Sequence, residues 1–177
     1  MAYLITCSGS KQNPVFINES KLENLSFNDK LFETRTKMIK LSKIELDWNK
    51  TLPAWQLYSG TYSKVYPQVS EENWLKPNAD IMILSALFGW IKHTDLVPFY
   101  NLAMADKISN FNVWKIWNHF DILSNLIKNT DIDLLSPDYR KAVIGRDKPI
   151  GIIPNEHFTD RGVQKGRWLN EQLNKLL

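Results

Sequence analysis

The stretch YLITCSGSK, residues 3–11, joins an apolar segment directly to a run of small polar residues. Its first part, Tyr3–Cys7, is apolar and β-branched, which is typical of a buried strand. A second such segment, DIMIL at residues 80–84, leads into SALFG at residues 85–89. Two buried strands that end in loops of small residues favour an α/β fold, in which ligands bind beside the carboxyl ends of the strands.

Helical patterns surround these two segments. Apolar residues recur at helical spacing over residues 27–44 and again over residues 113–127. Ser136 and Pro137 are typical of the N-cap and the first position of a short helix, which we expect to end near Val143. This mixture of strands and helices predicts an α/β fold with a small mixed or parallel central sheet covered by helices.

Further segments complete the expected organisation. We expect a short helix over residues 62–66 and a third strand over residues 149–153. Thr159 or Asp160 is expected to cap a final helix. The length and the lack of internal repeats predict a single domain over residues 1–177.

Composition limits the classes of protein that this chain could be. With 44% hydrophobic residues and a net charge of +3, the chain is expected to fold, and its charge decides little about partners. No apolar run approaches the roughly 20 residues that a membrane span needs, and the first residues lack the pattern of a signal peptide. The single cysteine, Cys7, allows no internal disulfide and fits the reducing cytoplasm. His93, His119 and His157 lack the spacing of metal ligands, so we predict neither a metal site nor a cofactor.

The loop Ser8–Lys11 is the first candidate site. Gly9 permits a close approach of the backbone to a ligand. The hydroxyls of Ser8 and Ser10, the ammonium of Lys11 and the loop amides are donors suited to a phosphate or another oxyanion. The spacing differs from that of a P-loop, and the alternative is an ordinary polar turn. Cys7 beside it is a nucleophile or, more simply, a buried inert thiol.

The loop after the second strand, Ser85–Gly89, is the second candidate site, and Asp95 and Tyr100 follow it. Two strand-end loops of small residues suggest a shared cleft, because neighbouring parallel strands open at the same edge of a sheet. Asp95 is a candidate acid, base or acceptor for a ribose hydroxyl. Its alternative role is to cap a turn.

Basic residues near the end of the chain form the third candidate site. Arg161 and Lys165 are four residues apart and share one face of the expected helix, and Arg167 follows. These side chains either contact phosphates or form a solvated basic face.

The order of these motifs resembles the YaaA family of peroxide stress proteins and its shorter bacterial and phage relatives. In that family a first strand leads to a Ser-x-x-Lys loop, matched here by residues 8–11. A Tyr/Phe-x-Gly segment follows, matched by Tyr58-Ser59-Gly60 with Tyr62 close behind. The later matches follow in the family's order: Leu84–Gly89, Asp95, Tyr100–Met104, the helix around Trp117, Ser136–Tyr139 and Lys165-Gly166.

The resemblance covers nearly the whole chain, with two departures in one motif. Asn101 and Ala103 stand where the family has Arg and Glu, and typical members are longer than this chain. The resemblance implies a mixed α/β fold with a charged cleft, binding to DNA and a link to protection against oxidative stress.

The leading hypothesis is a site for a nucleotide or a nucleic-acid strand, with chemistry at the base or the glycosidic bond as its catalytic form. Ser8, Ser10 and Lys11 would hold the phosphate, Lys11 could attack a sugar carbon, and Asp95 would act as a general base or stabilise a cationic sugar. The other residues expected in this site are Tyr62 or Tyr100, as a stacking face for a base, with Gly60, Ser85 and Gly89.

Two alternatives stay open. A non-catalytic DNA-binding protein would use spread Lys and Arg contacts and no acid–base pair. An enzyme of small-molecule metabolism would use the same anion loop. Convergence of Lys11, Asp95 and Tyr100 in one closed pocket would favour catalysis over simple binding.

Overall fold

The computed structural model describes residues 1–155, 158–160 and 162–177, and a four-stranded sheet lies at its centre. The strands are ordered β4-β3-β1-β8. Their bounds are Tyr3–Thr6 for β1, Ile81–Ser85 for β3, Gly89–Lys92 for β4 and Ile132–Asp133 for β8. β1 runs parallel to β3 and to β8, while β4 returns antiparallel to β3. The expected α/β fold with a small mixed sheet is therefore confirmed.

β1 and β3 are the two buried strands that the sequence predicts. Tyr3 pairs with Ile81 and Thr6 with Leu84, so the two apolar segments lie side by side along their length. Every residue of β3 is buried, which is typical of a parallel strand covered on both faces. Gly89, with a φ of 67°, allows the tight reversal from β3 into β4.

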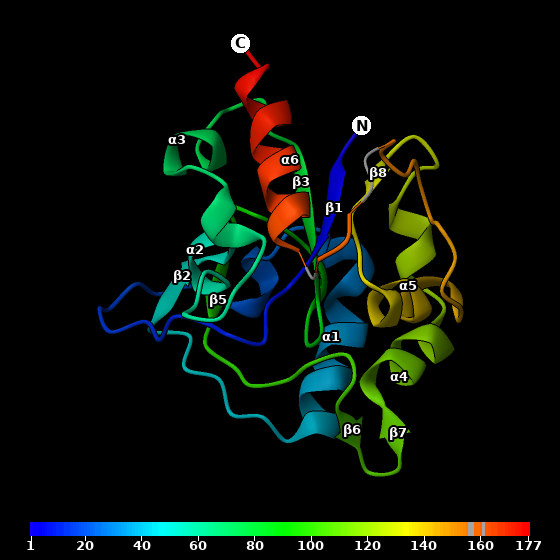
Figure 1. Ribbon diagram of the computed structural model, residues 1–177. Coiled ribbons are helices and arrows are strands. Elements are labelled where there is room, and N and C mark those ends of the chain that lie inside the picture. Colours follow the sequence, from blue (N-terminus) through cyan, green and yellow to red (C-terminus); the bar gives the residue numbers. More distant parts are fainter. Residues whose placement is uncertain (156–157, 161) are drawn as a thin grey trace.

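Helices and short strands fill the connections around this sheet (Figure 1). The helices are η1 (Leu22–Asn24), α1 (Asn28–Ser42), α2 (Ala54–Leu57), η2 (Tyr66–Gln68), α3 (Glu71–Trp74), α4 (Val113–Phe120), η3 (Leu123–Leu126), α5 (Pro137–Ile144) and α6 (Val163–Asn174). Two antiparallel pairs lie outside the sheet: β2 (Thr51–Pro53) with β5 (Leu96–Pro98), and β6 (Lys107–Ile108) with β7 (Phe111–Asn112). In Figure 1, α6 runs alongside β1, and α4 and α5 lie together to the right, away from α2 and α3.

A buried arginine fastens α1 to the β3–β4 hairpin. Arg35 donates from Nε to the carbonyl of Phe88 at 2.8 Å, and from one terminal nitrogen to the carbonyls of Trp90 and Ser26, both at 2.7 Å. Burial lowers the pKa of Arg35 to about 10, and the carboxylate of Asp95 opposes that shift. Because one guanidinium serves three carbonyls, the helix and the hairpin are held in a fixed relation.

Two expected helices differ from the structure. The helix expected over residues 113–127 is shorter, because α4 ends at Phe120 and Asp121 takes a left-handed conformation with a φ of 52°. Residues 62–65 form turns and bends rather than the expected helix. The chain becomes helical only at Tyr66, where η2 begins with Pro67 in its first turn.

The segments that follow β8 match their predictions in part. The strand expected over residues 149–153 is not formed, and this segment makes a single isolated bridge to β8. The N-cap of α6 is Gly162 rather than the expected Thr159 or Asp160, although the carboxylate of Asp160 accepts hydrogen bonds from the amides of Gly162 and Gln164. No helix in the described part of the chain is both long and apolar enough to cross a membrane.

Candidate functional site

Three strand-end loops meet at the carboxyl edge of the parallel strands. The loop Ser8–Lys11 follows β1, the turn Ser85–Phe88 follows β3, and the segment Leu134–Ser136 follows β8. Because β1 lies between β3 and β8 and is parallel to both, all three loops open at the same edge. The strand order also reverses at β1, since the chain goes first to one side of it and later to the other. Such a reversal creates a crevice for ligands in α/β folds.

The Ser8–Lys11 loop is held against the segment that contains Gly60 and Ser63. The hydroxyls of Ser8 and Ser63 are 2.8 Å apart, and the Tyr62 amide donates to the Ser10 hydroxyl at 2.9 Å. A Cβ on Gly60 would lie 2.5 Å from the backbone of Lys11, so glycine is required there for close packing. The serine hydroxyls therefore already contact protein atoms. Gly9 is exposed, and a Cβ there would meet no atom within 4 Å.

Lys11 places its amine in a buried position without a hydrogen-bond partner among the described residues. The Nζ atom lies 4.6 Å from the centre of the Tyr100 ring and 5.7 Å from that of Tyr58. Burial lowers the pKa of Lys11, and negative charge on Cys7 or Asp106 opposes the shift. A lysine in such surroundings is poised to lose its proton more easily than a surface lysine.

The Tyr100 ring beside this amine carries the central hydroxyl of three that are linked by hydrogen bonds. The Tyr100 hydroxyl is 2.6 Å from that of Tyr58 and 2.7 Å from that of Ser85. The Ser85 oxygen also accepts from the amides of Leu87 and Phe88, so its own proton is directed to Tyr100. Burial raises the pKa values of both tyrosines, which keeps the hydroxyls neutral at physiological pH.

We call Cys7, Lys11, Tyr58, Ser85 and Tyr100 the Lys11 cluster. It brings together three residues that the sequence predicts for one site, namely Lys11, Ser85 and Tyr100. Gly89, which was also expected there, instead shapes the hairpin: its φ is positive, and a Cβ on it would lie 3.0 Å from the Trp117 ring.

Asp95 is not part of this cluster, which corrects the arrangement expected from the sequence. Its carboxylate accepts hydrogen bonds from the amide and the hydroxyl of Ser26, at 2.9 and 2.7 Å, and from the amide of Lys92 at 3.0 Å. Asp95 lies away from Lys11 because of the β3–β4 hairpin. β4 runs antiparallel to β3, so the residues after β4, including Asp95, lie near the start of β3 rather than at its carboxyl end. The carboxylate whose charge acts on Lys11 is that of Asp106.

A cleft of about 530 Å³ lies at the strand ends of β1 and β8, and we call it the β1–β8 cleft. It is lined by Thr6, Val65, Leu134, Ser136, Pro137, Asp138, Asp160, Gly162 and Lys165. The first turn of α5 and the approach to α6 therefore both face it. Backbone amides at such helix starts favour negatively charged groups.

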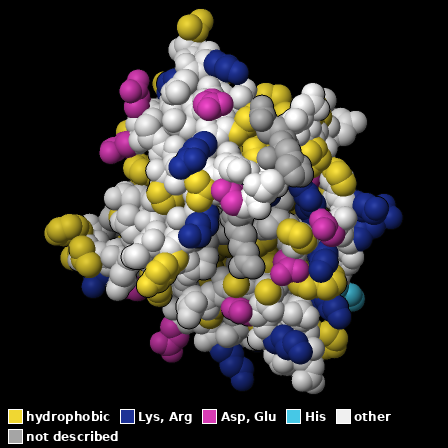
Figure 2. Space-filling model, viewed as in Figure 1, with side chains coloured by type: hydrophobic (Ala, Val, Ile, Leu, Met, Phe, Trp, Pro, Cys, Tyr) yellow, Lys and Arg dark blue, Asp and Glu magenta, His cyan; other side chains and the backbone are white. Residues whose placement is uncertain are grey.

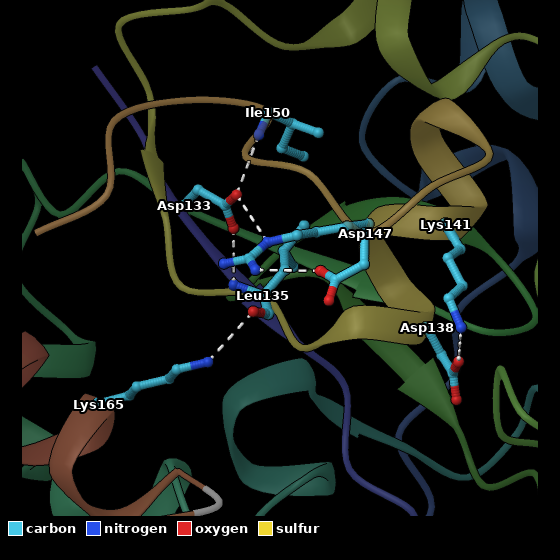
Figure 3. A network of polar contacts seen from close by, with 8 residues as sticks. Asp133, Leu135, Asp138, Lys141, Asp147, Ile150 and Lys165 are labelled. Atoms are coloured by element: carbon cyan, nitrogen blue, oxygen red, sulfur yellow. Dashed lines mark hydrogen bonds and ion pairs between the residues drawn. The ribbon is translucent and has the colours of Figure 1, made fainter. Parts of the chain in front are cut away.

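Lys165 supplies a positive charge to this cleft. Its Nζ donates to the carbonyl of Leu135 at 3.1 Å, as Figure 3 shows, which leaves further donor capacity on the ammonium group. Burial lowers the pKa of Lys165, and the positive charge of Arg140 lowers it further. The carboxylates of Asp133, Asp160 and Asp147 oppose these shifts, and an anion in the cleft would oppose them further.

A buried carboxylate fixes the wall of the cleft. Asp133 accepts hydrogen bonds from the amides of Leu135 and Ile150, at 2.9 and 3.1 Å, and from Nε of Arg140 at 2.9 Å (Figure 3). Arg140 also contacts Asp147 at 3.3 Å. These bonds hold the segment from β8 into α5 in one shape, so Ser136 at the N-cap of α5 is firmly positioned.

Cys7 joins the Lys11 cluster to the β1–β8 cleft. Its sulfur is 3.2 Å from the hydroxyl of Tyr139 on α5, and the preceding residue, Thr6, lines the cleft. The sequence did not single out Tyr139 or Tyr58 as site residues. Both lie in motifs of the family resemblance, the Ser-x-x-Tyr helix start and the Tyr-x-Gly segment, so a signal for them was present.

The structure places Lys165 and Arg167, two of the three basic residues of the third candidate site, in different surroundings. Lys165 faces the cleft, whereas Arg167 is exposed and lies 3.3 Å from the side chain of Gln68. Arg161 lies outside the described residues. Figure 2 shows Lys and Arg side chains interspersed with Asp and Glu over this face, rather than gathered in one basic patch. The described residues contain no group of His, Cys, Asp and Glu able to hold a metal ion.

Comparisons with known proteins support the resemblance of the motifs. A family model described as the peroxide stress protein YaaA matches residues 14–162. A UPF0246 protein of Shewanella piezotolerans is 34% identical over 86 residues, corresponding to 42% of this chain and 33% of that protein. The match thus spans about a third of the length of that relative.

Proposed function

This chain belongs to the peroxide stress protein YaaA family, and on that basis we propose that it binds a nucleotide, free or as a unit of a nucleic-acid strand, in the β1–β8 cleft. The observation that carries the proposal is the half-buried Lys165 in a cleft at the reversal of strand order. The Ser8–Lys11 loop follows β1, whose last residue, Thr6, lines the cleft. It is less suited than the cleft to holding phosphate, because its hydroxyls already contact the segment around Gly60 and Ser63.

The size and chemistry of the cleft support a small anionic ligand. A volume of about 530 Å³ is in the range of small-molecule sites. Lys165, the Ser136 hydroxyl and the amides at the start of α5 are donors for a phosphate. The carboxylate of Asp138 on the same wall is an acceptor for a sugar hydroxyl or an amino group of a base.

The charge on the face seen in Figure 2 favours a single nucleotide unit over a long duplex contact. A protein that follows the backbone of duplex DNA needs a stripe of positive charge. Acidic and basic side chains alternate over the face seen in Figure 2. Affinity is therefore proposed to come from the cleft, with a shallow dependence on salt concentration.

Binding measurements on matched variants test this proposal. Calorimetry with a mononucleotide, and anisotropy with labelled single-stranded and duplex oligonucleotides, would compare Lys165→Gln with Lys175→Gln. Both variants lose one positive charge near or in α6, but Lys175 is exposed and lies outside the cleft. We expect Lys165→Gln to weaken mononucleotide binding by about tenfold or more, because a charge-assisted hydrogen bond is lost. Lys175→Gln should leave it unchanged.

Two results would count against this function. Absence of binding to any nucleotide or oligonucleotide at low salt would remove it. Duplex binding that falls steeply with salt and is weakened equally by both variants would instead support a non-catalytic protein with spread phosphate contacts.

A further inference from the structure

The Lys11 cluster has a chemistry that phosphate binding does not use. The Lys11 amine is enclosed, faces two aromatic rings and has no hydrogen-bond acceptor among the described residues. A lysine whose purpose is an ion pair would lie against a carboxylate, as Lys92 lies 2.6 Å from Asp80 in this same protein. Burial without an acceptor therefore makes the neutral amine, which is the nucleophilic form, easier to reach than on an exposed lysine.

We propose that Lys11 forms an imine with the aldehyde carbon of an open-chain pentose, the group that is exposed when a nucleotide has lost its base. The choice of a pentose rests on the proposed function, because it places the sugar phosphate in the β1–β8 cleft. The reaction itself needs only the amine and an aldehyde.

The step balances without any added oxidant or reductant. The nitrogen of Lys11 attacks the carbonyl carbon, a C–N bond forms, and the carbonyl oxygen becomes a hydroxyl. That oxygen then leaves as water, having taken up both protons of the amine, and a C=N bond remains. The centre of the Tyr100 ring lies 4.6 Å from Nζ, and the neutral Tyr100 hydroxyl is hydrogen-bonded to that of Ser85 at 2.7 Å, so this pair is available to relay these protons.

Access to the amine follows from the position of Lys11 in the chain. Its backbone belongs to the Ser8–Lys11 loop, in which Gly9 is exposed and has open space around its Cα. The lysine side chain has four rotatable bonds, and no hydrogen bond to the described residues holds Nζ in place. Nζ can therefore shift toward a carbonyl carbon by side-chain rotation without breaking a hydrogen bond.

No acceptor in the described part of the chain holds the ammonium form of Lys11 by a hydrogen bond. The carboxylate of Asp106 favours that form, but it is not within hydrogen-bond distance of Nζ. Tyr58 and Tyr100 stay neutral because they are buried, so they add no charge that would hold the ammonium form. The rings do attract a cation, and this attraction is the competing, purely structural role.

Reductive trapping of the full chain tests the inference. The protein is incubated with 2-deoxyribose 5-phosphate and cyanoborohydride, which converts an imine into a stable secondary amine, and the adduct is located by peptide mass mapping. We expect Lys11 to be labelled about tenfold or more faster than exposed lysines such as Lys175. Lys11→Met should lose the fast phase while unfolding at or above the wild-type temperature, because it removes the buried amine that has no partner among the described residues. Lys11→Arg should also lose the fast phase, because a guanidinium forms no imine.

A second aldehyde separates this inference from the proposed function. Phosphate-free 2-deoxyribose should label Lys11 equally in the wild type and in Lys165→Gln, whereas labelling by the 5-phosphate should slow in Lys165→Gln. If the variant leaves both rates unchanged, the imine stands and the phosphate site in the cleft fails. If labelling is spread over surface lysines and Lys11 reacts no faster than Lys175, the imine inference is overturned, whatever nucleotide binding shows.

Discussion

Replacing Lys11 by methionine should make the protein more stable. The Nζ atom is buried without a hydrogen-bond partner among the described residues, and such a group costs about 1–3 kcal/mol. Methionine keeps a flexible unbranched side chain against the rings of Tyr58 and Tyr100, but it loses the attraction of the ammonium to them, worth about 1 kcal/mol. We therefore expect a gain of about 1 kcal/mol, or about 2–4 °C in Tm for a domain of this size.

The pH dependence of the stability difference between the wild type and Lys11→Met provides a second test. Burial lowers the pKa of Lys11 in the folded state, so between the folded and the unfolded pKa the unfolded chain binds the extra proton. Wild-type stability therefore rises with pH through that window, and the advantage of Lys11→Met should shrink toward pH 10. Urea unfolding of both proteins at pH 7.5 and pH 10 measures this. A methionine variant that is less stable by 1 kcal/mol or more at pH 7.5 would refute the reasoning, because the amine would then hold the fold together.

Three other substitutions follow from the structure. Gly60→Ala should destabilise the protein and displace the Ser8–Lys11 loop, because its Cβ would lie 2.5 Å from the Lys11 backbone, whereas Gly9→Ala should be neutral. Thermal unfolding of the two variants tests this, and equal melting temperatures would contradict it. Arg35→Met should cost about 3 kcal/mol or more in urea unfolding, because the carbonyls of Phe88 and Trp90 lose their donors, and a loss below about 1 kcal/mol would contradict this account. Burial lowers the pKa of His93 in the folded state, so the wild type should lose stability as pH falls below about 6.5. His93→Gln should lose less stability between about pH 7.5 and 5.5, and equal losses in the two proteins would contradict a buried neutral imidazole.

The parts of the fold that were predictable are those in which local sequence and burial agree. β1 and β3 are continuous apolar runs with the loops of the candidate site at their ends, so pattern alone located them. The N-cap Ser136 and Pro137 at the start of α5 were predicted for the same reason, because capping chemistry is local. The adjacency of the Ser8–Lys11 and Ser85–Phe88 loops followed once those two strands were assumed to be parallel neighbours.

The errors arise where a single residue or a distant contact decides the structure. The apolar stripe continues past Phe120 to Leu123 and Ile127, but the left-handed Asp121 ends α4, and periodicity carries no information about one such residue. β8 has only two residues, one of them the buried Asp133, so it lacks the apolar pattern of a strand. Its place in the sheet depends on pairing with β1, which is remote in sequence.

The role expected for Asp95 failed for a topological reason. Asp95 follows Ser85 closely in the sequence, which suggested that both belong to the carboxyl edge of the sheet. The β3–β4 hairpin instead returns the chain along β3 to the opposite edge before Asp95 is reached. Tight turns such as the one at Gly89 reverse the direction of the chain, and so they decide at which edge of a sheet a later side chain lies. Lys11 and Tyr100 still come together, because the chain after β5 returns to the carboxyl edge.

The central position of β1 has a consequence for synthesis on the ribosome. The strand that emerges early has two hydrogen-bonding edges, and its partners are made only when residues 81–85 and then 132–133 have emerged. During that interval the apolar strand can pair with another nascent chain. In a chain truncated before residue 130, β3 pairs with one edge of β1, but the other edge, which β8 would cover, has no partner. Such a chain should therefore associate through the open edge of β1 more readily than the full sequence.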